Sequence, residues 1–90
     1  MIELGGGIKL EGFETIEPSL LIVVKKVVGN YAKKMSEQVS GFKDLIVNVS
    51  DNYKIGATII ADSEYSSDAT NPNLFFALDK ALGEVLDKAK

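Results

Sequence analysis

The chain contains no cysteine, histidine, tryptophan or arginine among its 90 residues. The lack of cysteine excludes disulfides, thiol catalysis and thiolate metal sites. The lack of histidine removes the side chain that most often serves as a general base, and also the commonest metal ligand. These absences exclude many familiar active-site chemistries. We therefore expect a protein that is not an enzyme and that has no metal site and no cofactor.

Positive charge is carried by lysine alone, and acidic residues outnumber it. Ten lysines stand against 13 aspartates and glutamates, which gives a formal net charge of −3. Arginine is the usual residue for bidentate contacts to phosphate and guanine, and most nucleic-acid-binding domains are basic. Taken over the whole chain, the composition weighs against nucleic-acid binding.

Long apolar runs are also lacking. The longest, Leu20 to Val24, is far shorter than the roughly 20 residues that a membrane-spanning helix needs. The first residues have no basic start of the kind found in signal peptides. We expect a cytoplasmic protein with no membrane partner. The hydrophobic content of 46% favours one folded domain, which we place at residues 8–90 after a short strand or flexible lead at residues 1–7.

The stretch from Pro18 to Val39 has the periodicity of an amphipathic helix, with proline in the first turn and Gly41 as a stop signal. Apolar residues recur at three- and four-residue steps on one face: Leu20, Val24, Val27, Val28, Tyr31, Met35 and Val39. The opposite half carries Lys25, Lys26, Lys33 and Lys34. These four lysines form either an ordinary solvated face or a cationic stripe for RNA phosphate.

Three strand patterns and a second helix follow. Residues 45–50, 53–61 and 64–69 alternate between two faces, and the turn pair Asp51-Asn52 predicts a hairpin. Asn71 and Pro72 predict the N-cap and first residue of a helix that runs to about Lys88. Both helices are amphipathic and the strands are mostly joined by hairpins. We therefore predict an α+β two-layer sandwich in the order β-α-β-β-β-α, with both helices on one face of a mostly antiparallel sheet.

Some apolar side chains fall outside the expected core. Phe76 lies on the polar side of the last helix beside Lys80, and Ile22 and Val23 lie among the lysines of the first helix. Such an aromatic residue usually packs under a loop or a partner subunit, although it can also form a stacking platform for a base or ligand. Phe76 and Lys80 are therefore candidates for a partner or stacking surface.

Two further clusters give no sign of chemistry. Asp62, Glu64 and Asp68 form the densest acidic group, but their spacing does not match a calcium-binding EF-hand loop. Alternation places the last two on an exposed strand face, where charge protects a sheet edge. Gly5-Gly6-Gly7 is either a hairpin turn or a flexible junction. A phosphate cradle is disfavoured there because a strand, not a helix, follows.

The element order and two local patterns suggest a family. One pattern is Ile8-Lys9-Leu10-Glu11-Gly12, followed by a helix opening near Ile16; the other is Tyr65-Ser66-Ser67-Asp68-Ala69, followed by Asn73-Leu74-Phe75-Phe76-Ala77-Leu78-Asp79. Over roughly Ile8 to Lys90 the chain resembles the ribosome hibernation-promoting factor family, the S30AE-like cold-shock-associated ribosome inhibitors, including small archaeal members. The resemblance implies a domain shaped like a double-stranded-RNA-binding domain. It also implies binding to the small ribosomal subunit in the decoding channel, which blocks translation.

Two functions remain open. In the first, the chain is a non-catalytic, ribosome-associated RNA-binding protein whose partner is the rRNA of the small subunit and whose phosphate-binding residues are Lys25, Lys26, Lys33 and Lys34. In the second, it is a protein-interaction or self-associating domain without nucleic-acid binding. That domain would form a homodimer through an edge strand or through the exposed Phe76 and Ile60. Phosphate-driven binding must weaken steeply with salt, and this separates the two.

Overall fold

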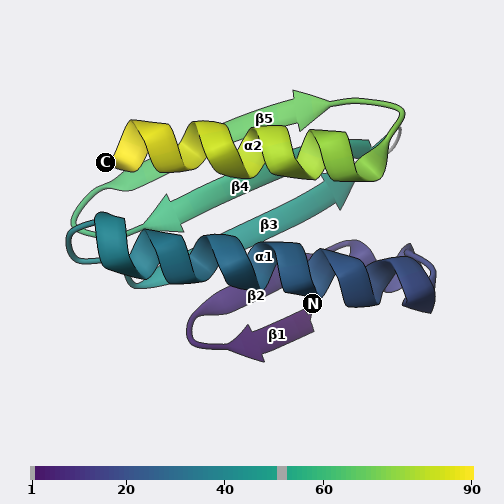
Figure 1. Ribbon diagram of the computed structural model, residues 1–90, viewed down its shortest axis with the longest axis horizontal. Helices are drawn as coiled ribbons and strands as arrows, with labels where there is room; N and C mark the ends of the chain where they lie inside the picture. The colour runs from purple at the N-terminus through teal and green to yellow at the C-terminus, as the bar shows by residue number, and fades with distance from the viewer. Residues whose placement is uncertain (1, 51–52) are drawn as a thin grey trace.

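The computed structural model describes residues 2–50 and 53–90. Its elements, in chain order, are β1 (Ile2–Gly5), β2 (Ile8–Glu11), the 3-10 helix η1 (Phe13–Thr15), α1 (Pro18–Gln38), β3 (Asp44–Ser50), β4 (Lys54–Ile60), β5 (Glu64–Thr70) and α2 (Leu74–Ala89). The strands form one sheet in the order β1-β2-β3-β4-β5, and both helices lie over one face of it (Figure 1). The predicted α+β two-layer sandwich is confirmed.

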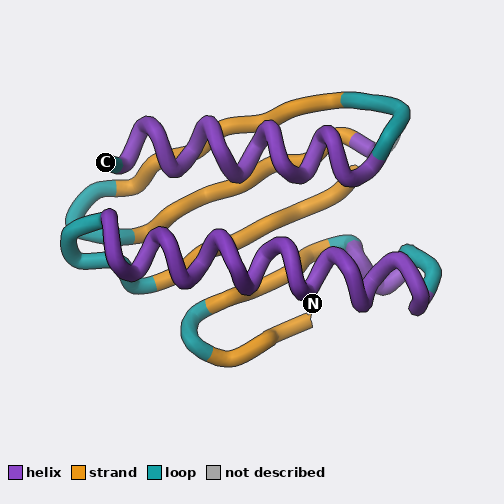
Figure 2. The backbone as a smooth tube through the Cα atoms, in the orientation of Figure 1, coloured by secondary structure: helices purple, strands orange, loops and turns teal. Residues whose placement is uncertain are grey.

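The sheet is mixed, with one parallel pair among the described strands. β2 and β3 run parallel, because α1 carries the chain back across the sheet between them, and the other neighbours are antiparallel. The two helices run in the same direction, so their N-terminal ends lie at the same end of the molecule (Figure 2). Gly5, Gly6 and Gly7 make the hairpin turn between β1 and β2 at positive φ. The turn pair Asp51-Asn52 lies outside the described residues.

The core lies between the sheet and the helices. The strands contribute every second residue, as their alternation predicted, including Leu45, Val47, Ile55, Ala57 and Ile59. From η1, Phe13 is fully buried beside them. Gly12 makes the tight turn that precedes it. At a φ of 80°, a Cβ on Gly12 would lie 2.6 Å from the backbone oxygen of Val49, so the position accepts only glycine.

The predicted core face of α1 is partly corrected. Val24, Val28, Met35 and Val39 are buried, as expected, and Ala32 is buried as well. Leu20, Val27 and Tyr31 are only half-buried. These three share a flank of α1, and Tyr31 on that flank reaches α2. One stripe of α1 therefore packs against the sheet, and the adjacent stripe of α1 faces α2.

The predicted start of the last helix is wrong by two residues. The N-cap is Asn73, whose side-chain oxygen accepts hydrogen bonds from the N–H groups of Phe75 at 2.9 Å and Phe76 at 3.3 Å. Asn71 makes a local turn instead, since its side-chain oxygen accepts from the N–H of Asn73 at 2.8 Å. Pro72 therefore precedes the cap, and α2 begins at Leu74.

Among the described residues, no helix has the length and apolar character needed to cross a membrane.

Candidate nucleic-acid interface

The outer face of α1 carries the four lysines that the sequence singled out. Lys25, Lys26, Lys33 and Lys34 are all exposed, and no ion pair joins any of them to an acidic residue in the described chain. Lys26 and Lys33 are seven residues apart, so they lie on the same side about 10 Å apart along the axis. Lys25 and Lys34 lie on the two flanks. The lysines thus cover the outer half of the helix in a broad patch, which we name the α1 lysine patch.

Charge is unevenly distributed over the fold. α1 holds the four lysines and a single acid, Glu37, which gives 4 − 1 = +3. The whole chain has a formal charge of −3, so the residues outside α1 sum to −6. Positive formal charge is therefore concentrated on α1, and the net charge of the whole chain does not show this.

The second helix adds little positive charge. Lys80 is exposed, but α2 also holds Asp79, Glu84 and Asp87 against its two lysines. Lys88 donates to the backbone oxygen of Ser66 at 2.8 Å, and Lys90, just after the helix, lies 3.5 Å from the carboxylate of Asp87.

A contact between the helices fixes one edge of the patch. The Tyr31 hydroxyl donates to Oδ1 of Asp79 at 2.7 Å, and the Lys34 ammonium lies 5.2 Å from the centre of the Tyr31 ring. Burial, together with the Asp79 carboxylate, raises the pKa of Tyr31 to about 12. The sequence showed Tyr31 and Asp79 but gave no reason to pair them, because they are 48 residues apart.

Replacement of Tyr31 by Phe removes this hydrogen bond and keeps the ring. We expect the variant to lose about 1 kcal/mol of unfolding free energy at pH 7. The folded-state pKa lies above the ordinary value of 10.0, so folding favours the neutral phenol. That contribution is complete below about pH 10 and disappears as the pH rises to about 12. Urea unfolding of both proteins should show their difference shrinking across this window; a constant difference would contradict the assignment.

The exposed apolar residues lie mostly where the sequence placed them. Phe76 is 67% exposed, Ile22 64% and Val23 43%. Phe76 and Lys80 are four residues apart and share one face of α2. The N–H of Phe76 donates to the Asn73 cap, which fixes the aromatic residue in the first helical turn. Ile60 is half-buried, so its predicted exposure is wrong.

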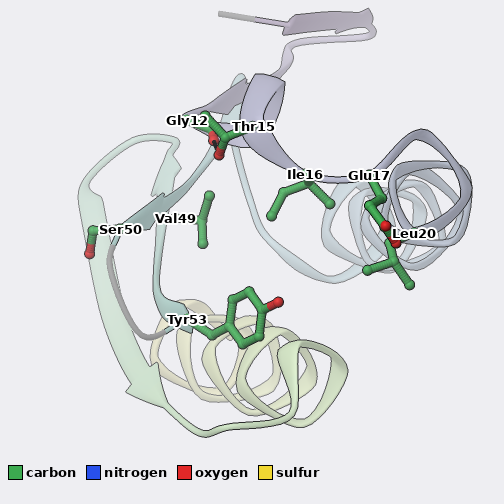
Figure 3. Close-up of a pocket in the computed structure, with 8 residues that line it drawn as sticks. All are labelled: Gly12, Thr15, Ile16, Glu17, Leu20, Val49, Ser50 and Tyr53. Atoms are coloured by element: carbon green, nitrogen blue, oxygen red, sulfur yellow. Dashed lines mark hydrogen bonds between the residues drawn. The ribbon is translucent and has the colours of Figure 1, made fainter.

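A hollow of about 540 Å³ opens between the start of α1 and the ends of the neighbouring strands. The side chains of Ile16, Val49 and Tyr53 come from three segments to form its apolar wall (Figure 3). Tyr53 was predicted as the first residue of the strand at 53–61, but it precedes β4, has a φ of 53° and stays 36% exposed. No lysine lines the hollow, so it is separate from the α1 lysine patch.

Comparisons with known proteins bear on the fold. No protein-family model matches the sequence, and no curated protein does. Among solved structures, the chain is similar to the ribosomal subunit interface protein from Coxiella burnetii, with a TM-score of 0.60, 14% sequence identity and 91% of each chain covered. At this identity the likeness shows the fold alone. The chain therefore has the fold of a ribosomal subunit interface protein, which is the fold that the family resemblance implied.

Proposed function

We propose that this protein is a non-catalytic, ribosome-associated factor that binds rRNA of the small subunit through the α1 lysine patch. The observation that carries the proposal is the segregation of charge, +3 on α1 within a chain of −3. The shared fold supports the choice of partner, since the similar solved structure is described as a ribosomal subunit interface protein. Phe76 and Lys80 are proposed as an accessory surface on which an unpaired base stacks.

The acidic balance of the chain is compatible with this proposal. At physiological ionic strength the interaction between exposed charges is largely screened beyond about 8 Å. The molecule extends 33 × 23 × 17 Å, so many of its acidic side chains lie farther than that from a phosphate seated on α1. The local charge of the patch governs the contact, and the net charge affects mainly the rate of approach.

The proposal is tested by co-sedimentation of the purified protein with small ribosomal subunits over a range of salt concentrations. Four phosphate contacts predict a slope of about −2.8 to −3.6 in log affinity against log salt. Affinity should then fall about 50- to 150-fold between 50 and 200 mM salt. Absence of binding at low salt would contradict the proposal.

A second candidate function, self-association, is favoured by the outer edge of β5. The Ile60 oxygen accepts from the N–H of Lys43, so the backbone N–H and C=O groups of the even-numbered residues of β4 point towards β3. Those of the odd-numbered residues point towards β5. The register then directs the backbone groups of Glu64, Ser66, Asp68 and Thr70 outward, away from the sheet, and of these the Ser66 oxygen accepts from the Lys88 ammonium at 2.8 Å. A second copy of the chain could add its own β5 there.

Sedimentation equilibrium over a wide range of protein concentration tests this alternative. If β5 edges pair, the mass should rise towards a dimer, and Asp68→Pro should restore the monomer. This substitution removes an outward N–H and leaves the bonds to β4 in place. Phe76→Ser tests the apolar surface separately. A strict monomer at the highest concentration would remove self-association from consideration.

A further inference from the structure

Gly29 occupies an unusual position in the middle of α1. A glycine inside a helix destabilises it by roughly 1 kcal/mol relative to alanine, because the unfolded chain loses more freedom on folding. Such a glycine is often explained by a neighbour that leaves no room for a side chain. Here a Cβ placed on Gly29 would meet, apart from its chain neighbours and its own helix backbone, no atom of the described residues within 4 Å, and the φ of Gly29 is not positive. Neither packing nor backbone conformation within the described fold requires glycine there.

The neighbours of Gly29 on the helix surface are mainly cationic. Residues three and four positions away in either direction surround any given position of a helix. For Gly29 these are Lys25, Lys26, Ala32 and Lys33, and Ala32 is the buried one. The exposed surroundings of Gly29 are therefore three lysines. Gly29 is itself half-buried, and the absence of a side chain leaves a shallow open gap between the three lysines.

We infer that this gap seats a phosphate of the RNA backbone. Without a Cβ at position 29, a phosphate can approach the helix closely enough to be reached by all three lysines at once. A small anionic group fits this arrangement better than an apolar partner, because the rim of the gap carries three positive charges. The inference rests on the proposed function and adds to it a contact point for the RNA strand.

Gly29→Ala separates stability from binding. The variant should melt about 4–8 °C higher, since alanine favours the helix and nothing obstructs its methyl group. Its affinity for small ribosomal subunits at low salt should nevertheless fall about fivefold or more, and Gly29→Leu should lower it further. A methyl group that stabilises the protein and weakens binding points to a close contact made by the ligand.

Gly83→Ala is the matched control in α2. A Cβ at Gly83 would lie 3.6 Å from the Tyr31 hydroxyl, which is ordinary contact, so alanine fits. Its exposed surroundings include Asp79 and Asp87 as well as Lys80, so no cationic gap exists there. Gly83→Ala should raise the melting temperature and leave the affinity at the wild-type value.

The outcomes separate this inference from the proposed function. If Gly29→Ala binds like wild type while glutamine at the four lysines abolishes binding, the phosphate seat is wrong and the lysine patch stands. If wild type does not bind at low salt, both are wrong. A drop in the melting temperature of Gly29→Ala, or equal loss of binding in Gly83→Ala, would also overturn the seat.

Discussion

Simultaneous replacement of Lys25, Lys26, Lys33 and Lys34 by glutamine should abolish binding to small ribosomal subunits at 100 mM salt. Each phosphate contact contributes about 0.7–0.9 to the slope of log affinity against log salt, so the salt dependence should flatten by about 2.8–3.6 units. The four side chains are exposed, and surface substitutions of this kind usually change stability by less than about 0.5 kcal/mol each. Circular dichroism should therefore show an intact fold.

A control of equal net charge distinguishes the patch from overall charge. Glutamine at four lysines outside α1, namely Lys9, Lys43, Lys54 and Lys90, gives the same charge as the α1 variant, −3 − 4 = −7. If the contact is local, this control should retain most of the wild-type affinity, whereas the α1 variant loses it. Equal losses in the two variants would mean that net charge governs binding, and the assignment to α1 would be wrong.

Phe13→Ala should have the largest effect on stability. Phe13 is fully buried at the point where β2 passes into α1 through η1. Truncation of a buried phenylalanine leaves a cavity as well as losing burial, and it costs about 3–5 kcal/mol. A small domain has about 5–15 kcal/mol of stability in total. The variant should thus lose a large share of the stability of the domain, which urea unfolding would measure.

Phe76→Ala is the same chemical change at an exposed site. Because Phe76 is 67% exposed, the unfolding free energy should change by no more than about 0.5 kcal/mol. If Phe13→Ala cost less than about 1 kcal/mol, or if Phe76→Ala cost as much as Phe13→Ala, the described core would be contradicted. The pair also prepares a stable Phe76 variant for binding experiments.

The sequence could predict most of the fold because local periodicity reports burial. The three- and four-residue spacing of apolar residues marked α1, and Pro18 marked its start. Alternation marked β3, β4 and β5 and divided each strand into two faces, and it placed Glu64 and Asp68 of β5 on an exposed face. The four lysines were also identified correctly as exposed, since a helix that buries one face must present the other to solvent.

The local sequence pattern could not place the exact ends of elements where neighbouring residues give the same signal. Asn71 and Asn73 both suit an N-cap, and only the folded chain shows that the first makes a turn while the second caps α2. Tyr53 continued the alternation of its strand, yet the connection before β4 turns its backbone into the left-handed region. In both cases the path of the chain between elements determined the result, and that path depends on where the elements pack.

By itself, the sequence determined the two amphipathic helices, the alternating strands, and the absence of cysteine and histidine chemistry. The tertiary structure alone decided that Tyr31 meets Asp79 and that no neighbouring element among the described residues fills the space beside Gly29. Burial of apolar side chains is periodic along the chain and can therefore be predicted from it. Contacts between distant residues, and the empty space beside a residue, depend on how the crossover through α1 places one helix beside the other.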